Sequence, residues 1–331
     1  MEKSGSKNSG FPSSAGIVEA AKRIAGYIHR TPVFASESID RIAGCKLVFK
    51  CENFQKAGAF KMRGALNAIL SLTEEERSRG VATHSSGNHA QAVALAAKML
   101  GIPAFVVMPE NSSPVKANAA KGYGAQLRFC KPTLQAREEE LQKVVERTGA
   151  VFIPPYDDYR IIAGQATAAM ELIEDFPGLD IIMAPVGGGG LLSGTALSVH
   201  YFGKNIRTIA GEPEGAADAC ESIRKGEIVP SVNPVTIADG LLTSLGKKNF
   251  RIIQKFVSGI WLASDREILD AMILVWERMK IVIEPSAAVP LAALLKNKEK
   301  VAGRKVGVIL SGGNYDIGRL FGKRHPLENT G

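Results

Sequence analysis

Four loops of the sequence combine residue types that can do chemistry, and each follows a short apolar segment. The first loop, AFKMRGA, contains Lys61. A lysine near the N-terminus of a helix lies at the positive end of the helix dipole, which disfavours its ammonium form. A partly buried lysine with a lowered pKa is what imine formation with a carbonyl cofactor requires. Taken alone, Lys61 is more typical of an ordinary surface lysine than of a catalytic one.

The second loop, THSSGNHAQA, combines two serines, a glycine, an asparagine and a histidine before an Ala-rich helical segment. Free backbone N–H groups at the start of that helix would converge on one anion, a phosphate or an α-carboxylate. The N–H groups concerned belong to Ser86, Gly87, Asn88 and His89. In the alternative interpretation Ser85 and Ser86 only cap the helix. The combination exceeds what a cap needs, and both interpretations remain open.

The third and fourth loops follow segments typical of buried strands. In PVGGGGLLSG, four consecutive glycines let the backbone close around a phosphate. The loop is not GxGxxG and lacks the Lys-Ser/Thr of a P-loop, which disfavours nucleotide hydrolysis. In LSGGNYD, Ser311 stands where a parallel strand ends, so its hydroxyl is placed to meet a ring nitrogen. A simple tight turn is the alternative for this fourth loop.

The elements that must position these loops alternate between short β-branched segments and Ala/Leu-rich helical segments. This alternation predicts βαβ units, that is, an α/β fold with parallel sheets and helices on both faces. Strands are predicted at residues 46–51, 81–83, 104–108, 127–130, 151–153, 181–186 and 306–310. Helices are predicted at residues 60–72, 88–100, 113–122, 134–148 and 162–176.

The domain organisation predicted from these elements is a small domain inserted into a larger one. Residues 80–157 form the small mobile domain, and residues 16–79 with 158–331 form the large one. The hinges are expected near Arg79–Gly80 and within residues 154–158. Residues 1–15, rich in Ser, Gly and Lys, are expected to be a flexible tail.

Composition excludes several classes of function. The net charge of +8 is dispersed, which favours a solvated surface over nucleic-acid binding and suits anionic small molecules. No apolar segment is long enough to span a membrane, and the N-terminus lacks the apolar stretch of a signal peptide. The four cysteines and five histidines show neither CxxC nor HExxH spacing. We therefore expect a cytoplasmic protein with free thiols and no zinc site.

A lysine, two anion-binding loops and a hydroxyl at a third strand end together suit pyridoxal 5′-phosphate (PLP). The sequence resembles fold-type II PLP enzymes, specifically the serine racemase and threonine (serine) dehydratase group, close to threo-3-hydroxyaspartate dehydratases. The resemblance covers nearly the whole chain after about residue 15. It depends on KCENFQKAGAFKMRGALNA, THSSGNHAQA, PVGGGGLLSG, GEPEGAAD, IADG, ERMKIVIEPSAA and LSGGN. It implies the tryptophan synthase β-like fold, with two parallel-sheet domains, and a homodimer.

The resemblance also implies roles for individual residues. Lys61 would carry the cofactor and act as the base on one face of the substrate Cα, and Phe60 would pack beside the ring. Asn88 would bond the ring hydroxyl, and Ser311 would meet the pyridine nitrogen. The phosphate would be held by Gly187, Gly188, Gly189, Gly190 and Leu191. The substrate would be held by Ser85, Ser86, Asn88, His89, Arg137 and Ser244.

These roles imply a reaction on β-hydroxy amino acids. A serine cannot keep the pyridine nitrogen protonated, so the ring is a weaker electron sink and prompt loss of a β-hydroxyl is favoured. That elimination releases a 2-oxo acid and ammonia. A hydroxyl at Ser86, opposite Lys61, adds the second proton carrier that racemisation needs.

The expected activity is therefore racemisation of serine together with dehydration of L-serine, L-threonine or threo-3-hydroxyaspartate. The alternative is a dedicated L-threonine or threo-3-hydroxyaspartate ammonia-lyase without significant racemisation. A β-replacement enzyme would carry a TSGNTG-like loop where this chain has SSGNHAQ. A PLP-holding or nucleotide-sensing protein without activity would need Lys61 or Ser86 disabled, and neither is.

Two further sites come from the resemblance. In GEPEGAAD, the side chains of Glu212 and Asp218 and the carbonyl of Ala216 match a divalent-cation site. All-oxygen ligation suits Mg²⁺, with Ca²⁺ or Mn²⁺ as alternatives, and a solvated acidic turn is the other interpretation. Lys280 and Asn314 match positions at which the racemase group binds ATP as an allosteric effector.

Arg137 has two interpretations. The resemblance places it facing the substrate side chain, where its planar guanidinium would favour a second carboxylate. The alternative is an exposed helix arginine with partners four residues away.

Overall fold

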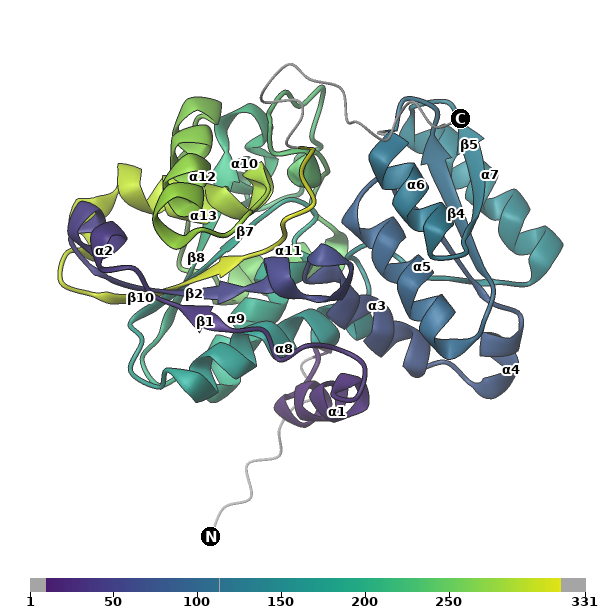
Figure 1. The fold of residues 1–331 in the computed structure, drawn as a ribbon, viewed down its shortest axis with the longest axis horizontal. Coiled ribbons are helices and arrows are strands. Elements are labelled where there is room, and N and C mark those ends of the chain that lie inside the picture. The colour runs from purple at the N-terminus through teal and green to yellow at the C-terminus, as the bar shows by residue number, and fades with distance from the viewer. Residues whose placement is uncertain (1–9, 113, 317–331) are drawn as a thin grey trace, which may run out of the picture.

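The computed structural model describes residues 10–112 and 114–316. Figure 1 shows two α/β parts side by side, one built on a six-stranded sheet and the other on a four-stranded sheet. Within these residues, no helix is long and apolar enough to cross a membrane. The four cysteines are free, and three of them are buried.

The larger sheet has the order β1-β2-β10-β7-β8-β9. All neighbouring strands are parallel except β1, which pairs antiparallel to β2 at the edge. The central strands β7 and β10 are almost completely buried, as expected for a parallel sheet covered on both faces. The strands are β1 (Val33–Phe34), β2 (Lys46–Cys51), β7 (Ile181–Pro185), β8 (Arg207–Pro213), β9 (Gly259–Ala263) and β10 (Lys305–Leu310).

The smaller sheet has the order β5-β4-β3-β6 and is entirely parallel. Its strands are β3 (Val81–His84), β4 (Ala104–Pro109), β5 (Gln126–Cys130) and β6 (Val151–Phe152). The predicted α/β class is thus the observed one. The hydrophobic core beside this sheet also contains Met62 and Leu66, which precede the predicted small domain.

Helices cover both sheets, and those predicted from the sequence are present with ends shifted by a few residues. The α-helices are α1 (Ser14–Ile24), α2 (Glu37–Ala43), α3 (Lys61–Leu70), α4 (Glu74–Ser78), α5 (Asn88–Leu100), α6 (Pro114–Gly122), α7 (Leu134–Thr148), α8 (Tyr159–Asp175), α9 (Gly190–Phe202), α10 (Asp218–Lys225), α11 (Lys247–Phe256), α12 (Asp265–Met279) and α13 (Pro285–Lys296). Short 3₁₀ helices are η1 (Glu52–Phe54), η2 (Lys56–Gly58), η3 (Glu214–Ala216), η4 (Asp239–Leu241) and η5 (Lys298–Val301).

Close contacts between small residues bring helices α3, α8 and α9 together. A Cβ atom on Gly164 of α8 would lie 2.6 Å from the carbonyl oxygen of Arg63 in α3. A Cβ atom on Gly194 of α9 would lie 2.6 Å from the backbone nitrogen of Ala166 in α8. Larger residues at these glycines would force the helices apart. The crossing therefore fixes the positions of α3 and α9, which begin at two of the candidate loops.

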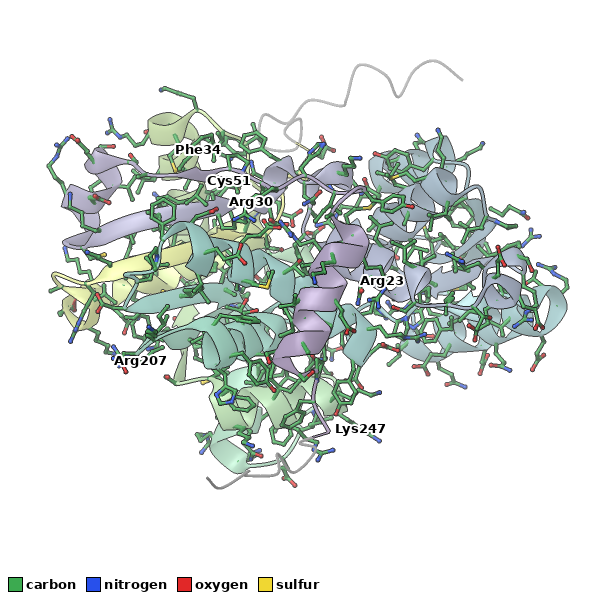
Figure 2. All side chains as sticks on the ribbon, turned by 90° about the horizontal axis from the view of Figure 1, so that it is seen from below. Arg23, Arg30, Phe34, Cys51, Arg207 and Lys247 are labelled. Carbon is green, nitrogen blue, oxygen red and sulfur yellow. The ribbon has the colours of Figure 1, made fainter. Side chains whose placement is uncertain are left out.

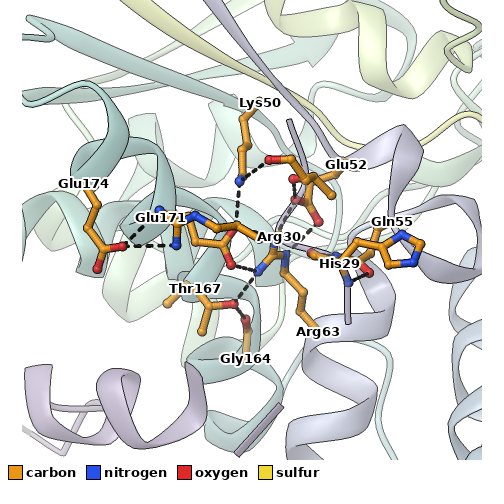
Figure 3. A network of polar contacts seen from close by, with 12 residues as sticks. His29, Arg30, Lys50, Glu52, Gln55, Arg63, Gly164, Thr167, Glu171 and Glu174 are labelled. Atoms are coloured by element: carbon orange, nitrogen blue, oxygen red, sulfur yellow. Dashed lines mark hydrogen bonds and ion pairs between the residues drawn. The ribbon is translucent and has the colours of Figure 1, made fainter. Parts of the chain in front are cut away.

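A buried ionic network fixes the first turn of α3 (Figure 3). The guanidinium of Arg63 binds both carboxylate oxygens of Glu52 and of Glu171, at 2.7–2.8 Å, and Thr167 Oγ1 at 3.0 Å. Lys50 Nζ also donates to Glu171, at 2.6 Å. Two cations and two carboxylates balance, so each buried charge has a partner. Removing one member of such a network typically costs about 3–5 kcal/mol.

Helix α1 adds a link between the chain's N-terminal region and α3. Arg23 projects from α1 toward the junction of the two parts (Figure 2), and its Nη1 donates to Asn67 Oδ1 of α3 at 2.6 Å. Asn67 Nδ2 in turn donates to the carbonyl of Arg160 in α8 at 2.6 Å. The helix that begins at Lys61 is thus held by hydrogen bonds on both sides.

Candidate functional site

A cavity of about 400 Å³ brings the four candidate loops together. It lies where β3, β7 and β10 end, the expected place for a ligand in parallel α/β sheets. Most of the site residues named from the sequence line it. They are Phe60, Lys61, Ser85, Ser86, Asn88, His89, Arg137, Gly187, Gly188, Gly189, Gly190, Leu191 and Ser311.

Lys61 is the first residue of α3 and extends into this cavity. Its Nζ donates to the carbonyl oxygen of Pro155 at 2.8 Å and lies 5.2 Å from the centre of the Phe60 ring. Burial lowers the pKa of the Lys61 amine to about 8, and the carboxylate of Glu284 opposes part of that shift. A lysine with this pKa is a far better nucleophile near neutral pH than one in water.

The loop between β3 and α5 presents its polar groups to the same cavity. Ser85 Oγ accepts a hydrogen bond from Gly87 N at 3.2 Å. Helix α5 begins at Asn88, and its N-cap residue is Gly87, which has no side chain. The two serines therefore do not act as the N-cap of this helix. The N-terminus of α5 faces the cavity, so it is placed to bind a carboxylate.

Two histidines of this region line the cavity and are neutral. Burial lowers the pKa of His89 to about 3 and that of His84 to about 4. His89 Nε2 lies 3.0 Å from the carbonyl oxygen of Ile153, and because a carbonyl only accepts, this nitrogen carries the proton. Burial therefore disfavours the doubly protonated, cationic form of both rings near neutral pH.

The glycine loop between β7 and α9 is closely packed on both sides. A Cβ atom on Gly188 would lie 2.4 Å from the Tyr156 ring, and one on Gly187 would lie 2.8 Å from Leu241 Cα. Gly189 has a φ of +92°, in the left-handed region that favours glycine. Helix α9 begins at Gly190, so its N-terminus points to the cavity. This geometry fits a phosphate group.

Asn88, the predicted ring ligand, has two protein partners. Its Nδ2 donates to Glu284, at 2.8 Å to Oε1 and 3.1 Å to Oε2. Its Oδ1 accepts from Asn314 Nδ2 at 2.9 Å. Burial raises the pKa of Glu284 to about 7, although the Asn88 hydrogen bond opposes the shift. Glu284 was assigned no role from the sequence, although the segment ERMKIVIEPSAA that contains it is one of those that carry the resemblance.

Ser311 lies at the end of β10 and is almost completely buried. Its carbonyl oxygen accepts a hydrogen bond from Phe60 N at 3.0 Å, which ties the end of β10 to the loop before Lys61. The side chain lines the cavity. Ser311 and Lys61 therefore line the same cavity.

Other cavity residues were missed by the sequence analysis. Lys116 of α6 forms an ion pair with Asp239 of η4 across the cavity. The hydroxyl of Tyr156 lies 2.9 Å from Thr243 Oγ1. Thr243 lines the cavity, whereas the adjacent Ser244, which was predicted to bind the substrate, does not. Ser244 Oγ instead accepts a hydrogen bond from Ser231 N at 2.8 Å.

Arg137 of α7 lines the cavity and is half-buried. Its Nε lies 3.4 Å from the carbonyl oxygen of Thr133, four residues earlier. Among residues 10–112 and 114–316, no carboxylate forms an ion pair with its guanidinium. The side chain can therefore accept an anionic group from a ligand.

The candidate cation site lies outside the cavity, at the end of β8. Glu212 accepts from Ala219 N at 2.7 Å and from Cys220 N at 2.8 Å. Both carboxylate oxygens of Asp218 are buried, and hydrogen bonding by the Ser231 side chain and the Leu245 backbone lowers its pKa without outweighing burial. Burial raises the pKa of Glu212 to about 8 and that of Asp218 to about 6. A pair of buried carboxylates whose hydrogen bonds do not offset the effect of burial fits a bound cation.

The two residues assigned to a nucleotide lie in different settings. Lys280 is exposed at the C-cap of α12, and its Nζ donates to the carbonyl of Glu277. Asn314 points inward and donates to Asn88 and to the carbonyl of Ala57. Their assignment to a nucleotide stays a prediction. In the described chain, no group of three or more His, Cys, Asp or Glu side chains is arranged to hold a metal ion.

The comparisons with known proteins agree with the geometry of the cavity. The sequence pattern of the PALP family, described as "Pyridoxal-phosphate dependent enzyme", matches residues 24–312. A serine racemase of Dictyostelium discoideum is 51% identical over 308 residues, covering 92% of this chain and 95% of the relative. A beta-hydroxyaspartate dehydratase of Paracoccus denitrificans is 47% identical over 310 residues, covering 94% and 98%. The structure of maize serine racemase superposes with a TM-score of 0.91 at 45% identity, covering 94% of this chain and 96% of that one.

Proposed function

The chain belongs to the pyridoxal-phosphate dependent enzyme family, and from that premise we propose that it is a serine racemase and β-hydroxy amino acid dehydratase. It interconverts L- and D-serine and eliminates water from L-serine, L-threonine or threo-3-hydroxyaspartate. One observation carries this proposal. A lysine with a lowered pKa and a serine hydroxyl line the same cavity as a helix N-terminus suited to the α-carboxylate.

The residues of the cavity fit PLP. The cradle at Gly187–Gly190 has the form of a phosphate site, and a Cβ atom at Gly188 would strike Tyr156. Lys61 supplies the amine, and Ser311 supplies a buried hydroxyl for the pyridine nitrogen. When bound, PLP supplies an aldehyde for the substrate amine and a ring that withdraws electrons from Cα. The rest of the chemistry depends on side chains of this chain.

Two side chains would move protons at the substrate Cα. Lys61 Nζ is neutral in a substantial fraction near pH 8 and takes the proton on its own face. Ser86 lines the cavity and serves the other face. A serine hydroxyl is too weak an acid to do so unaided, so its neighbours in the site must activate it.

The substrate would be held by groups at two ends. The N-terminus of α5, with Ser85 and Ser86, binds the α-carboxylate. The guanidinium of Arg137 takes a second carboxylate, as in threo-3-hydroxyaspartate. The 47% identity to a beta-hydroxyaspartate dehydratase favours the same substrate. A dedicated hydroxyaspartate or threonine lyase without racemisation is the second candidate.

One assay distinguishes these two functions. The purified protein is incubated separately with L-serine, L-threonine and L-threo-3-hydroxyaspartate. Release of 2-oxo acid is followed, and D-serine is measured by chiral chromatography. Formation of D-serine together with a 2-oxo acid supports the dual activity, whereas a 2-oxo acid without D-serine supports the dedicated lyase. Absence of both from all three substrates contradicts the proposal.

Replacing Arg137 with alanine is expected to raise the KM for threo-3-hydroxyaspartate by about tenfold or more and to leave that for L-serine within about threefold. The reason is that only the first substrate carries a second carboxylate. Arg147→Ala, on the same helix but exposed and outside the cavity, is the matched control. Equal changes in KM for the two substrates would show that Arg137 does not select the carboxylate.

We also propose that Glu212, Asp218 and the carbonyl of Ala216 hold Mg²⁺, or Ca²⁺ or Mn²⁺ in its place. The cation would place a positive charge beside the buried carboxylates of Glu212 and Asp218. It would also fix the start of α10 against β8, because Asp218 and Glu212 stand on those elements.

Chelation tests the cation site. EDTA is expected to lower the melting temperature by a few degrees and Mg²⁺ to restore it, because a ligand of the native state stabilises it by mass action. Asp218→Asn should abolish this response. Glu221→Gln, on the same helix but paired with Arg224 at the surface, should retain it. A wild-type protein indifferent to both EDTA and Mg²⁺ would mean that this segment is only an acidic turn.

The remaining proposals concern assembly and regulation. We propose that residues 80–157 move as a small domain over the cavity, that two chains form a homodimer, and that the enzyme works in the cytoplasm. ATP would act as an allosteric effector, with Lys280 and Asn314 near its site. Size-exclusion chromatography with light scattering and assays with added ATP test the second and fourth of these.

A further inference from the structure

The side-chain amide of Asn314 links two parts of the site that are far apart in the sequence. Its Nδ2 donates to Asn88 Oδ1 at 2.9 Å and to the carbonyl oxygen of Ala57 at 2.7 Å. Asn88 is the candidate ligand of the cofactor ring, and Ala57 precedes Lys61 by four residues. The Asn314 amide thus donates one hydrogen bond to Asn88 and one to the Ala57 carbonyl.

The segment around Asn314 lies directly against the loop before Lys61. Gly313 N donates to the carbonyl of Gly58 at 2.9 Å, and Phe60 N donates to the carbonyl of Ser311 at 3.0 Å. A Cβ atom on Gly58 would lie 2.4 Å from Asn314 Oδ1. The loop is therefore packed too closely against Asn314 to admit a larger side chain at residue 58.

The backbone of that loop is in a conformation that needs support. Ala57 has a φ of +57°, in the left-handed region where a residue with a Cβ atom is disfavoured. The hydrogen bond from Asn314 to the Ala57 carbonyl holds the peptide group that follows this residue. Strained residues persist only where their surroundings fix them. Asn314 is one of the groups that hold Ala57 in this conformation.

The partners of Asn88 determine which way its amide group faces. The carboxylate of Glu284 only accepts hydrogen bonds while ionised, so it requires the NH₂ side of Asn88. Asn314 donates through its own NH₂ group, so it requires the oxygen side. The two partners therefore fix the Asn88 amide in one orientation. Asn88 Nδ2 contacts both oxygens of Glu284, at 2.8 and 3.1 Å, and Asn88 also lines the cavity.

We propose that Asn314 is a positioning residue for the cofactor site. It acts through Asn88, by holding the amide in the orientation that offers a hydrogen to the ring oxygen of PLP, and through Ala57, by holding the loop that leads to Lys61. This inference depends on the proposed role of Asn88 toward PLP. It adds a function to a residue that touches neither the substrate nor the ring.

The test measures PLP affinity in three variants of the full-length protein. Asn314→Ala is expected to raise the dissociation constant for PLP, titrated into apoenzyme, by about tenfold, since one positioning hydrogen bond is lost. Asn314→Asp has the same shape but places an acceptor against two acceptors, Asn88 Oδ1 and the Ala57 carbonyl. It should weaken PLP binding more than alanine does, and should shift the visible absorption band of the bound cofactor.

Asn53→Ala is the matched control. Asn53 also donates to the backbone beside Glu284, to the carbonyl of Val282 at 3.1 Å, and lies next to Gly313. It does not line the cavity. Its replacement should leave the dissociation constant for PLP and the absorption band unchanged.

A double-mutant cycle separates positioning from general stability. In an Asn88→Ala background, Asn314→Ala should raise the logarithm of the dissociation constant for PLP by less than half of the increase that it causes in the wild type. The reason is that Asn314 is proposed to act mainly through Asn88, which this background lacks. Melting temperatures of the apoenzymes are measured in parallel. Full additivity, or Asn314→Asp with wild-type affinity for PLP, would overturn the inference. A wild-type protein that binds no PLP would instead overturn the proposed function, so the two failures are distinguishable.

Discussion

Replacing Lys61 with alanine is expected to reduce elimination and racemisation alike by about a thousandfold or more, because in the proposed mechanism Lys61 both carries the cofactor and moves the proton on its own face of Cα. The Lys61 amine lies inside the cavity, and its hydrogen bond to the Pro155 carbonyl, at 2.8 Å, holds it there. Borohydride reduction of the wild-type holoenzyme, followed by peptide mapping, should find the cofactor on Lys61. Kinetics with L- and D-serine measure the loss of activity.

The lowered pKa of Lys61 gives this prediction a pH dependence. Only the neutral form of an amine attacks an aldehyde. Because the pKa of Lys61 is lowered, a larger fraction of Lys61 than of an ordinary lysine is neutral at any pH below about 10. Covalent attachment of PLP to apoenzyme should therefore become faster as the pH rises and level off above about 8. Attachment that continues to accelerate to pH 10 would contradict the burial of this amine.

A second lysine of the cavity provides the control for this experiment. Among the described residues, Lys116 is the other lysine that lines the cavity, and its Nζ forms an ion pair with Asp239. It should carry no cofactor after reduction, and Lys116→Ala should retain the trapped cofactor at Lys61. Cofactor found on Lys116 would mean that the site is built around a different amine.

The parts of this architecture with local sequence signals were predicted well. A parallel strand buried on both faces appears as a continuous apolar segment, and a glycine-rich loop directly after such a strand is typical of a backbone that closes around a ligand. The segment 181–186 and the four glycines after it illustrate both signals. The same reasoning predicted the parallel sheets and the helix after each anion-binding loop, because these features depend on residues close together in the chain.

The features that were missed depend on contacts between distant residues. Asn88 and Glu284 are 196 positions apart, and no pattern within either segment indicates that their side chains meet. The ion pair between Lys116 and Asp239 spans 123 positions. Such pairs follow from how the two sheets and their helices are placed together, which periodicity does not describe.

The assignment of Ser244 to the substrate stays a prediction, but the structure places the hydroxyl of its neighbour Thr243 at the cavity. Thr243 and Ser244 are adjacent and both carry a hydroxyl, so residue type does not distinguish them. The backbone after η4 turns so that Thr243 faces the cavity and meets the Tyr156 hydroxyl. The Ser244 hydroxyl instead accepts a hydrogen bond from Ser231 N. In an irregular segment there is no period from which to infer which neighbour points inward.

Replacing Ser86 with alanine is expected to separate the two faces of the substrate Cα. Conversion of L-serine to D-serine, and attack on D-serine, should fall by about a hundredfold or more, because the proposed mechanism places the Cα proton of D-serine on the face that Ser86 serves. Elimination from L-serine uses Lys61 on its own face and should stay within about tenfold of the wild type. Chiral chromatography and 2-oxo acid release measure the two reactions on the same enzyme.

The N-terminus of α5 does not depend on the Ser86 hydroxyl. The N-cap of α5 is Gly87, so Ser86→Ala leaves the helix cap in place. Both Lys61 and Ser86 line the cavity, as a mechanism with two proton carriers requires. A loss of activity on D-serine would therefore not arise from an unravelled helix, which an unchanged melting temperature of the variant should confirm.

Ser85→Ala supplies the matched control for the two-face prediction. Ser85 precedes Ser86, and its hydroxyl accepts a hydrogen bond from Gly87 N within the loop that we propose binds the α-carboxylate. Both enantiomers of serine carry that carboxylate, so Ser85→Ala should weaken reactions on L- and D-serine to the same extent. If Ser86→Ala also lowered both equally, Ser86 would act only in binding, and the proton carrier for the second face would have to be sought among other groups of the cavity.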